Sequence, residues 1–341
     1  MKPSPTAPRI HLVSTVKNEG PYLVEWLAYH KAIGVTDITL FSNDCTDGTN
    51  LMLDRLAHMG ELSHFDNPIG PGIDPQRRAY SRAGKMAAVR EADYVLIVDA
   101  DEFVNVHVGG ETAPGPARTL PALIDACGHP DAISLCWRLM GSGGTTHWVD
   151  APVLGRFPRG SAFDPPANGM VWGFKTLFRP AAFDYFGVHR PKFDRKIRQT
   201  IPLVRWVNGS GNDMGPRIAE KGWRFNADTL GTRHAHINHY AIKSREEFLL
   251  KRLRGTANSK DKSRIDLDYW DRYDLHDVAD ETPPLAPMLG EAERLLSDPD
   301  LAALRRACIE TSRRVLTGQL ADPDLRAFVE GPTGAAQAAT P

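Results

Sequence analysis

The fold is decided by residues 94–103, which read Tyr94-Val95-Leu96-Ile97-Val98-Asp99-Ala100-Asp101-Glu102-Phe103. Five apolar or aromatic residues in a row are typical of a central strand that is buried on both faces of a sheet. Carboxylates follow at the point where this strand ends. Because residues two apart on an extended chain point the same way, Asp99 and Asp101 are predicted to face one point at the edge of the sheet.

Two carboxylates that face one point repel each other, which raises one of their pKa values unless a cation lies between them. Hard oxygen ligands favour Mg²⁺ or Mn²⁺ over zinc. In open α/β sheets, ligands bind outside the carboxyl ends of the strands. We therefore predict a divalent cation at Asp99 and Asp101, with a diphosphate as its further ligand. The alternative is a pair of ordinary solvated acids, which the buried run before them disfavours.

The composition is that of a globular protein. The chain has 341 residues, of which 42% are hydrophobic, so it can bury a substantial core. With 41 Lys and Arg against 42 Asp and Glu, the net charge is -1, which disfavours a nucleic-acid partner. The apolar runs are too short for a transmembrane segment, and residues 1–5 lack the apolar core of a signal peptide. We therefore expect a cytoplasmic protein, which leaves a peripheral membrane location open.

The residues before the acidic strand alternate between strand-like and helix-like patterns. This alternation predicts an α/β fold with a mostly parallel central sheet flanked by helices and joined by right-handed crossovers. Strands are expected at 10–16, 38–41, 61–65 and 94–98. Helices are expected from Pro21 to Gly34, from Leu51 to Gly60 and from Pro75 to about Ala92.

The pattern is less regular after Phe103. Gly and Pro are frequent in 109–121, which predicts a surface loop. They are also frequent in 141–166, and a loop of this length in a compact domain is usually functional or poorly ordered. Further strands are expected at 132–139, 170–178 and 234–242, and helices from Ser244 and within 295–316. We predict a disordered lead-in at 1–9, one domain at 10–255, a C-terminal helical extension at 256–330 and a disordered tail at 331–341.

Polar loops follow three of the predicted strands, at 15–20, 43–49 and 99–102. Because the carboxyl ends of parallel strands meet at one edge, we expect these loops to converge on one crevice. There, Asp44 is suited to accept a hydrogen bond from an amide-like edge such as the N3–H of uracil, and Thr15 and Asn18 are suited to hold ribose or base. The alternative for Asp44 is ordinary turn and helix-capping chemistry.

A dense run of cations precedes the acidic strand, formed by Arg77, Arg78, Arg82 and Lys85. Such a run is suited to a diphosphate if one side chain reaches the crevice, although most of these charges are expected to lie on a solvated face. The sequence contains neither a G-x-x-x-x-G-K-[ST] loop nor a G-x-G-x-x-G motif that opens a helix. The phosphates are therefore expected to be held by a metal ion and not by a glycine-rich loop.

Three histidines, His234, His236 and His239, lie close together late in the chain. One of them is able to complete a metal site that two aspartates begin. Zinc is conceivable, but no H-E-x-x-H or Cys pattern supports it. A purely hydrogen-bonding role is the alternative for each of them.

Several motifs occur in order within residues 10–255. They are Val16-Lys17-Asn18-Glu19, Glu25-Trp26-Leu27-Ala28-Tyr29-His30, Gly34-Val35, Asn43-Asp44-Cys45-Thr46-Asp47-Gly48-Thr49, Asp99-Ala100-Asp101-Glu102-Phe103, His239-Tyr240 and Lys243-Ser244-Arg245-Glu246-Glu247-Phe248. Together they resemble the glycosyltransferase family 2-like group and the related family 92. The resemblance implies the GT-A fold, with a nucleotide-sugar-binding half at 10–105 and an acceptor half at 106–255. It also implies a nucleotide diphosphate sugar as donor and inversion through a single displacement.

Residue by residue, the resemblance implies that Asp44 reads the base, that Asp99 and Asp101 form a metal-binding D-x-D motif, and that His239 is a late metal ligand. Cys45 stands where the family usually has Ser. The predicted donor site consists of Thr15, Asn18, Glu19, Asp44, Arg78, Asp99 and Ala100. The predicted site for Mn²⁺ or Mg²⁺ consists of Asp99, Asp101 and His239.

The acceptor half is expected to supply a general base, because the attacking hydroxyl must lose a proton on the face of the sugar opposite the leaving group. The candidates are Asp213 in a polar loop and Asp150 after Trp148, with Glu102 behind them. Aromatic residues can stack on sugar faces or simply belong to the core, and the candidates are Trp137, Trp148 and Trp172.

These features predict a metal-dependent inverting glycosyltransferase that moves a hexose from a nucleotide diphosphate sugar, most simply a UDP-sugar, to a glycan or lipid-linked glycan in polysaccharide biosynthesis. One alternative is a sugar nucleotidyltransferase, although residues 14–20 lack the glycine-rich basic loop of such enzymes. The other is a non-catalytic glycan-binding protein, against which the intact Asp99 and Asp101 count.

Overall fold

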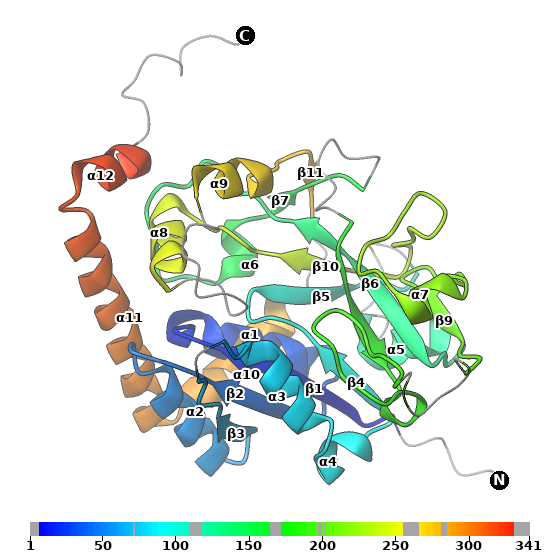
Figure 1. The fold of residues 1–341 in the computed structure, drawn as a ribbon. Coiled ribbons are helices and arrows are strands. Elements are labelled where there is room, and N and C mark those ends of the chain that lie inside the picture. The colour runs from blue at the N-terminus through cyan, green and yellow to red at the C-terminus, as the bar shows by residue number, and fades with distance from the viewer. Residues whose placement is uncertain are drawn as a thin grey trace.

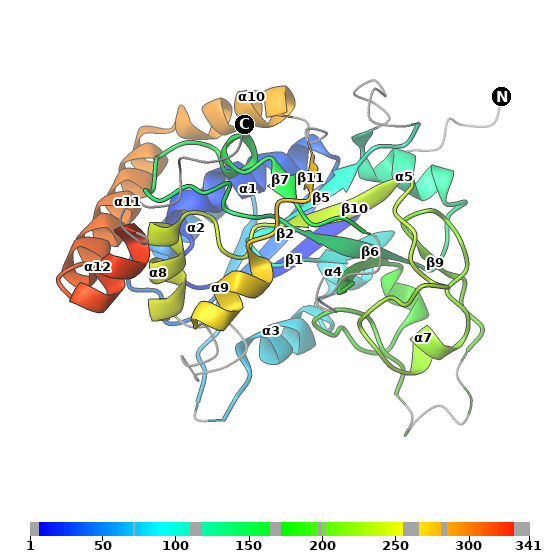
Figure 2. The same cartoon turned by 90° about the horizontal axis from the view of Figure 1, so that it is seen from above.

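The computed structural model describes residues 7–70, 72–109, 118–163, 172–194, 196, 200, 202–254, 266–280 and 285–330. A nine-stranded sheet runs through this part of the chain, and helices lie on both of its faces (Figures 1 and 2). Its strands are β1 (Ile10–Val16), β2 (Asp37–Ser42), β3 (Ser63–Asp66), β4 (Tyr94–Ile97), β5 (Glu102–Val106), β6 (Ala132–Leu139), β8 (Phe174–Phe178), β9 (Trp206–Asn208) and β10 (Ala235–His239). The order is β3-β2-β1-β4-β8-β6-β10-β5, and β9 pairs with β6.

The first half of the sheet is parallel, since β1 pairs with β2 and β4, and β2 pairs with β3. Every residue of β1 and of β4 is buried, as the continuous apolar runs predict for strands covered on both faces. The connecting helices are α1 (Gly20–Ala32), α2 (Thr49–His58), α3 (Pro75–Ala83) and α4 (Ala87–Arg90). The carboxyl ends of β1, β2 and β4 therefore meet at one edge, as expected.

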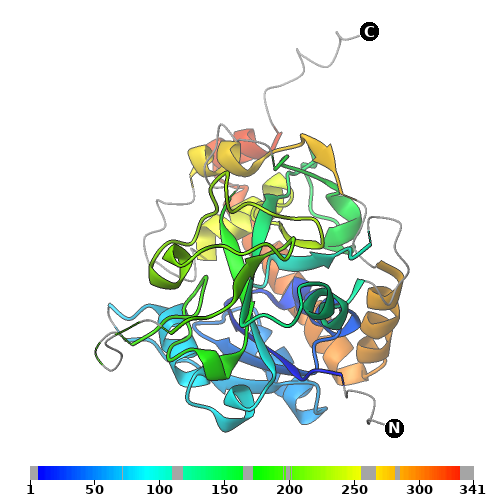
Figure 3. The ribbon, with the colours of Figure 1, turned by 90° about the vertical axis from the view of Figure 1, so that its right-hand side faces the viewer.

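The second half is mixed, and Figure 3 shows it above the blue and cyan first half. β8 pairs antiparallel with both β4 and β6, whereas β10 runs parallel to β6 and antiparallel to β5. Short helices lie around these strands, namely α5 (Leu120–Ala126), α6 (Val153–Arg156) and α7 (Arg217–Glu220), and a small sheet joins β7 (Arg159–Gly160) to β11 (Val278–Ala279). The backbone N–H of Tyr240 donates to the carbonyl of Asp101 at 2.8 Å, so β10 ends beside the acidic triplet.

The architecture confirms the predicted α/β fold, with mostly parallel pairings and flanking helices. Strand 132–139 has the predicted bounds. Two predictions were wrong: residues 102–106 form the unexpected strand β5, and the single helix expected over 75–92 is divided into α3 and α4. Most of the predicted lead-in and the whole predicted tail lie outside the described residues.

In the described part of the chain, five helices follow β10, and two of them pack against helices of the first half. They are α8 (Arg245–Arg254), α9 (Leu267–Tyr273), α10 (Leu285–Leu296), α11 (Pro299–Gln319) and α12 (Pro323–Glu330). α10 lies against α1, and α11 runs along α2, α1 and α8 (Figure 2). Fully buried Met288, Leu295 and Leu301 belong to the same core as the strands, although the division of the chain into domains stays a prediction. No helix within the described residues has both the length and the apolarity needed to cross a membrane.

Candidate functional site

The acidic triplet forms a tight turn between β4 and β5. The backbone N–H of Asp99 donates to Glu102 Oε2 at 2.7 Å, and the N–H of Glu102 donates to the carbonyl of Asp99 at 3.0 Å. The indole N–H of Trp26 on α1 lies 3.1 Å from the Asp99 carbonyl and 3.0 Å from the Glu102 carbonyl. These contacts fix the position from which the two aspartates extend.

Asp99 is held by residues of the first half of the sheet and by β8. Its Oδ1 accepts a hydrogen bond from Gln76 Nε2 at 2.8 Å, and its Oδ2 lies 2.9 Å from Lys175 Nζ. Lys175 is fully buried and also lies 3.6 Å from Glu102 Oε2. Burial acts to lower the pKa of Lys175, but the two carboxylates outweigh it and raise that pKa above its ordinary value. Lys175 is therefore a permanent counter-charge of Asp99.

Asp101 is held by the opposite end of the chain. Its Oδ2 accepts a hydrogen bond from Lys251 Nζ on α8 at 2.9 Å, and His239 Nε2 at the end of β10 lies 3.6 Å from its Oδ1. The residue is only 7% exposed. Burial acts to raise the pKa of Asp101, but Lys251 and His239 overcome this effect and hold the pKa well below its usual range. Asp101 is therefore an ionised, buried carboxylate.

The shared cation that the spacing predicts stays a prediction, and the structure gives each of the two carboxylates a different lysine partner. That prediction assumed an extended chain, whereas Ala100 and Asp101 lie in a turn and each aspartate has its own lysine. Within the described residues, no group of three or more His, Cys, Asp or Glu side chains is arranged to hold a metal ion. Of the three predicted metal ligands, the structure brings Asp101 and His239 together, while Asp99 is bound to Lys175 and Gln76.

The loops that follow β1 and β2 are joined by two hydrogen bonds of the Asn18 side chain to Thr46. Asn18 Oδ1 accepts a hydrogen bond from the Thr46 N–H at 2.8 Å, and Asn18 Nδ2 donates to Thr46 Oγ1 at 3.0 Å. Asn18 and Asp44 both have left-handed backbone conformations, with φ of 52° and 49°. The Asp44 side chain is exposed on its loop, where Lys17 Nζ is 3.9 Å from its Oδ2. Asp44 is therefore placed on the rim, where a ligand can reach it.

The other predicted donor-binding residues have different surroundings. Thr15 and Ala100 are buried at the ends of β1 and β4, with exposures of 5% and 6%. Glu19 forms an ion pair with Arg254 of α8, and the Arg254 guanidinium also donates to the Asn18 carbonyl at 3.1 Å. Arg78 lies half-buried on α3, two residues after the Gln76 that binds Asp99.

Unsatisfied polar atoms gather near the triplet. Gln76 Oε1, Glu102 Oε1, Trp137 Nε1 and His239 Nδ1 are buried without a hydrogen-bond partner among the described residues. Buried polar atoms in folded proteins nearly always have a partner, so such a group at one edge of the sheet is typical of a place that a ligand or water completes. This observation marks the edge as a binding site independently of any motif.

Aromatic rings line the side of the site that β6 and β10 form. The Trp137 ring lies 4.8 Å from His239 and 5.8 Å from Trp223, and Trp223 stacks on His189 at 4.7 Å. Burial lowers the pKa of His189 to about 3, so this ring is neutral. Trp172, half-buried nearby, donates to the Phe163 carbonyl. These flat faces are suited to the apolar face of a sugar ring.

The proposed general bases lie away from Asp101. Asp213 is exposed in the turn after β9, where its Oδ1 accepts from the Gly215 N–H at 2.6 Å. β9 pairs with the start of β6, about 20 Å along that strand from the end that lies beside His239. Asp150 forms an ion pair with Arg305 of α11 at 2.5 Å, and Trp148 packs on Tyr22 of α1. Glu102 is fully buried, and burial raises its pKa well above the usual range.

Sequence reasoning missed the cations that hold the triplet. Lys175 stands inside the strand Phe-Lys-Thr-Leu-Phe, where a charged residue in a buried strand is itself a signal of a specific partner. Lys251 and Arg254 lie in a basic helix that looks like a solvated face, and nothing in the sequence indicates that they reach back to Asp101 and Glu19. Trp223 and His189 carry no sequence signal of their own.

One curated protein and several solved structures are similar to this chain. No family model matches the chain. Over 86 residues, 25% of this chain, it is 29% identical to a glycosyltransferase family 92 protein of Arabidopsis thaliana. The match spans 14% of that protein's length. It confirms, for this part of the sequence, the resemblance to family 92 that the motifs indicate.

Solved structures of similar arrangement were also found. Residues 1–349 of TarS from S. aureus align over 91% of both chains, with 15% identity and a TM-score of 0.34, and TarS has been solved with UDP. Glucosyl-3-phosphoglycerate synthase from Mycobacterium tuberculosis, solved with Mn²⁺, UDP and glucosyl-3-phosphoglycerate, aligns over 38% of this chain and 44% of its own, with 16% identity and a TM-score of 0.25.

Proposed function

We propose that this protein is a glycosyltransferase that moves a sugar from a nucleotide diphosphate sugar to a hydroxyl acceptor. The observation that carries the proposal is the meeting of Asp101, His239 and Lys251 at the carboxyl end of β4, beside the loops of β1 and β2. This is the edge at which α/β sheets bind nucleotides. The sequence similarity to a family 92 glycosyltransferase supports the same conclusion.

The donor nucleotide is proposed to lie across the first two loops. Asp44 on the rim accepts the N3–H of uracil, and the linked loops at Asn18 and Thr46 hold the ribose. The diphosphate then points towards Asp101, Lys251 and the half-buried Arg78. A UDP-sugar is therefore the proposed donor, with the aromatic faces of Trp137 and Trp223 on the acceptor side.

The expected divalent cation fits part of the predicted site. Asp101 Oδ1 and His239 Nε2, 3.6 Å apart, are an oxygen and a nitrogen donor of the kinds that Mn²⁺ accepts. His239 Nδ1 is buried without a hydrogen-bond partner among the described residues. Two protein ligands leave the remaining positions to water and phosphate oxygens, as is common for Mg²⁺ at phosphates. When bound, such an ion neutralises the charge that develops on the leaving diphosphate.

The residues of the chain perform the other steps. The Lys251 ammonium attracts the leaving diphosphate. This attraction strengthens as negative charge develops on the diphosphate. Lys175 and Gln76 keep Asp99 in one orientation at the floor of the site. A single displacement with inversion, and a glycan or lipid-linked glycan as acceptor, remain part of the proposal. Asp150 and Asp213 are not used in it, because no contact in the described part of the chain joins either of them to Asp101.

The test is a screen of nucleotide sugars for nucleotide release, with and without Mn²⁺. The proposal predicts that at least one UDP-sugar is hydrolysed slowly by the wild type and that Asp101→Asn abolishes this release. Asp213→Asn is the matched control and is expected to keep the wild-type rate. A protein that binds UDP but turns over no nucleotide sugar would support the non-catalytic alternative and refute the proposal.

A further inference from the structure

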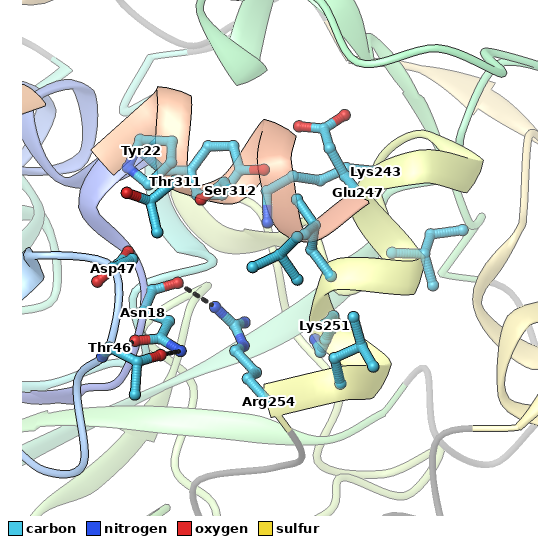
Figure 4. Close-up of a pocket in the computed structure, with 15 residues that line it drawn as sticks. Asn18, Tyr22, Thr46, Asp47, Lys243, Glu247, Lys251, Arg254, Thr311 and Ser312 are labelled. Atoms are coloured by element: carbon cyan, nitrogen blue, oxygen red, sulfur yellow. Dashed lines mark hydrogen bonds between the residues drawn. The ribbon is translucent and has the colours of Figure 1, made fainter. Parts of the chain in front are cut away.

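A cavity of about 170 Å³ is lined by Lys251, the residue that also binds Asp101 (Figure 4). Asn18 and the start of α1 form one wall, and Lys243, Lys251 and Arg254 form another. The third wall is α11, which contributes Thr311 and Ser312. Helix α11 therefore closes a space between α1 and α8.

Lys243 is the unusual residue of this cavity. It is 5% exposed and has a left-handed backbone conformation, with φ of 62°. Its ammonium lies 4.5 Å from the centre of the Tyr22 ring and makes one long hydrogen bond, 3.4 Å, to the Tyr240 carbonyl. No carboxylate of the described residues forms an ion pair with it. A buried ammonium is normally paired, because desolvation of a lone charge is costly.

The carboxylates around the cavity already have other partners. Glu247 pairs with Arg156, and Glu19 pairs with Arg254. Asp47 accepts hydrogen bonds from the Thr49 N–H and hydroxyl at 2.8 and 2.7 Å. Burial lowers the pKa of Lys243, although Glu19 and Asp101 oppose this effect. Among the described residues, Lys243 therefore has no anionic partner of its own.

We propose that the cavity binds a phosphoryl group, held by Lys243 with Arg254 and Lys251 beside it and with the hydroxyls of α11 on the opposite wall. Its volume suits one or two phosphoryl groups and not a whole nucleotide. Because Lys251 borders both this cavity and Asp101, the group belongs to a substrate of the transfer, a step that rests on the proposed function. The phosphate is either that of the donor diphosphate or one carried by the acceptor.

The test measures binding by calorimetry with pyrophosphate, glycerol 3-phosphate, UDP and uridine as probes. We expect Lys243→Met to weaken binding of a phosphorylated probe by at least about tenfold, as loss of a charge-assisted hydrogen bond implies, and to leave uridine unaffected. Lys243→Arg is expected to restore part of the affinity. Lys221→Met, at an exposed lysine after α7, is the matched control.

The probes distinguish the two sources of phosphate. Weaker binding of UDP alone identifies the donor diphosphate, whereas weaker binding of glycerol 3-phosphate to protein saturated with UDP identifies an acceptor phosphate. If Lys243→Met fails to fold, Ser312→Tyr on α11 fills the cavity from the other side and must produce the same loss. Wild-type affinity for every phosphorylated probe in the folded variants refutes the site.

This result is separable from the proposed function. Loss of phosphate binding in Lys243→Met, together with no turnover of any nucleotide sugar by the wild type, leaves the phosphoryl site standing and removes the transferase. Normal phosphate binding in Lys243→Met and Ser312→Tyr, together with turnover that depends on Asp101, removes the phosphoryl site and leaves the transferase standing.

Discussion

Asp99 and Asp101 are separated by a single residue, yet their side chains are held by different parts of the molecule. Asp99 is held by Lys175 and Gln76, in the interior of the sheet and on α3. Asp101 is held by Lys251 and His239, which come from α8 and the end of β10. The Lys175 side chain is fully buried, whereas that of Lys251 is 11% exposed beside a cavity.

The two aspartates therefore have different roles: Asp99 supports the structure of the site, and Asp101 takes part in binding and reaction. Lys175 is fully buried between Asp99 and Glu102 and is part of the packing of the sheet. Asp99 therefore serves mainly to shape the floor of the site. Lys251 also donates to the Ala241 carbonyl at 2.6 Å. It therefore keeps one hydrogen-bond partner when Asp101 binds a ligand. We therefore expect substitutions on the Asp99 side to change stability and those on the Asp101 side to change binding and rate.

The largest expected effect is that of Asp101→Asn on sugar transfer. The substitution keeps the size of the side chain but removes its charge, so transfer is expected to fall about 1,000-fold, or about 4 kcal/mol in activation free energy. Steady-state kinetics with the best donor measure this loss. The fold should persist, as seen by circular dichroism. A fall of less than about tenfold would remove Asp101 from the reaction.

Lys175→Met should act on stability first. Removing the buried cation leaves the half-buried Asp99 without its counter-charge, and breaking a buried pair costs about 3 kcal/mol or somewhat more. The urea midpoint of unfolding measures this change. Lys85→Met, at an exposed lysine after α3, is the control and should stay within about 0.5 kcal/mol of the wild type. A neutral Lys175→Met would contradict the separation of roles.

Lys251→Met is expected to cost less stability, about 1–2 kcal/mol, because Asp101 keeps His239 as a neighbour. The variant should bind Mn²⁺ more tightly than the wild type, since the ammonium that competes for Asp101 has gone. Titration of the ion followed by calorimetry gives this affinity directly. Weaker Mn²⁺ binding than in the wild type would mean that Lys251 supports the ion and does not compete with it.

The smallest expected effect is a loss of folding stability at acidic pH. One buried histidine in each half of the molecule contributes to it. Burial lowers the pKa of His30 on α1 to about 4 and that of His189 after β8 to about 3. Between the ordinary pKa of about 6.5 and these values, the unfolded chain binds more protons, so stability is lost as the pH falls through this window. Each histidine contributes at most about 1.4 kcal/mol per pH unit.

Urea midpoints at pH 7 and pH 5 measure the acid effect. His30→Phe and His189→Phe should each reduce the difference between the two midpoints. Equal loss of stability in the wild type and in both variants would show that neither ring is the acid-sensitive group.

The sequence predicts the parallel first half well, because strands covered on both faces leave uninterrupted apolar runs such as 94–97. It does not predict β5, since Glu102 and Asn105 are polar residues that this fold buries with specific partners. The carboxyl-end loops follow from the same parallel topology. The pairing of Lys251 with Asp101 does not, because it joins residues 150 positions apart and depends on how α8 packs.

The composition of the site stays a prediction, and the structure shows only which of its residues lie together. Asp101 and His239 are close, as the motif resemblance implies. Asp99 differs because spacing alone assumes an extended chain, and the chain turns at Ala100. A single sequence gives no geometry for loops, so it indicates Asp150 and Asp213 by their chemistry alone. The structure places Asp150 beside Arg305 and Asp213 in an exposed turn.

The affinity of UDP, measured by calorimetry with and without Mn²⁺ for the wild type, Asp101→Asn and His239→Ala, tests most directly whether Asp101 and His239 hold a cation at the diphosphate. Mn²⁺ is expected to tighten UDP binding by the wild type and to have no such effect in either variant. Equal enhancement by Mn²⁺ in all three proteins would show that neither residue holds the ion.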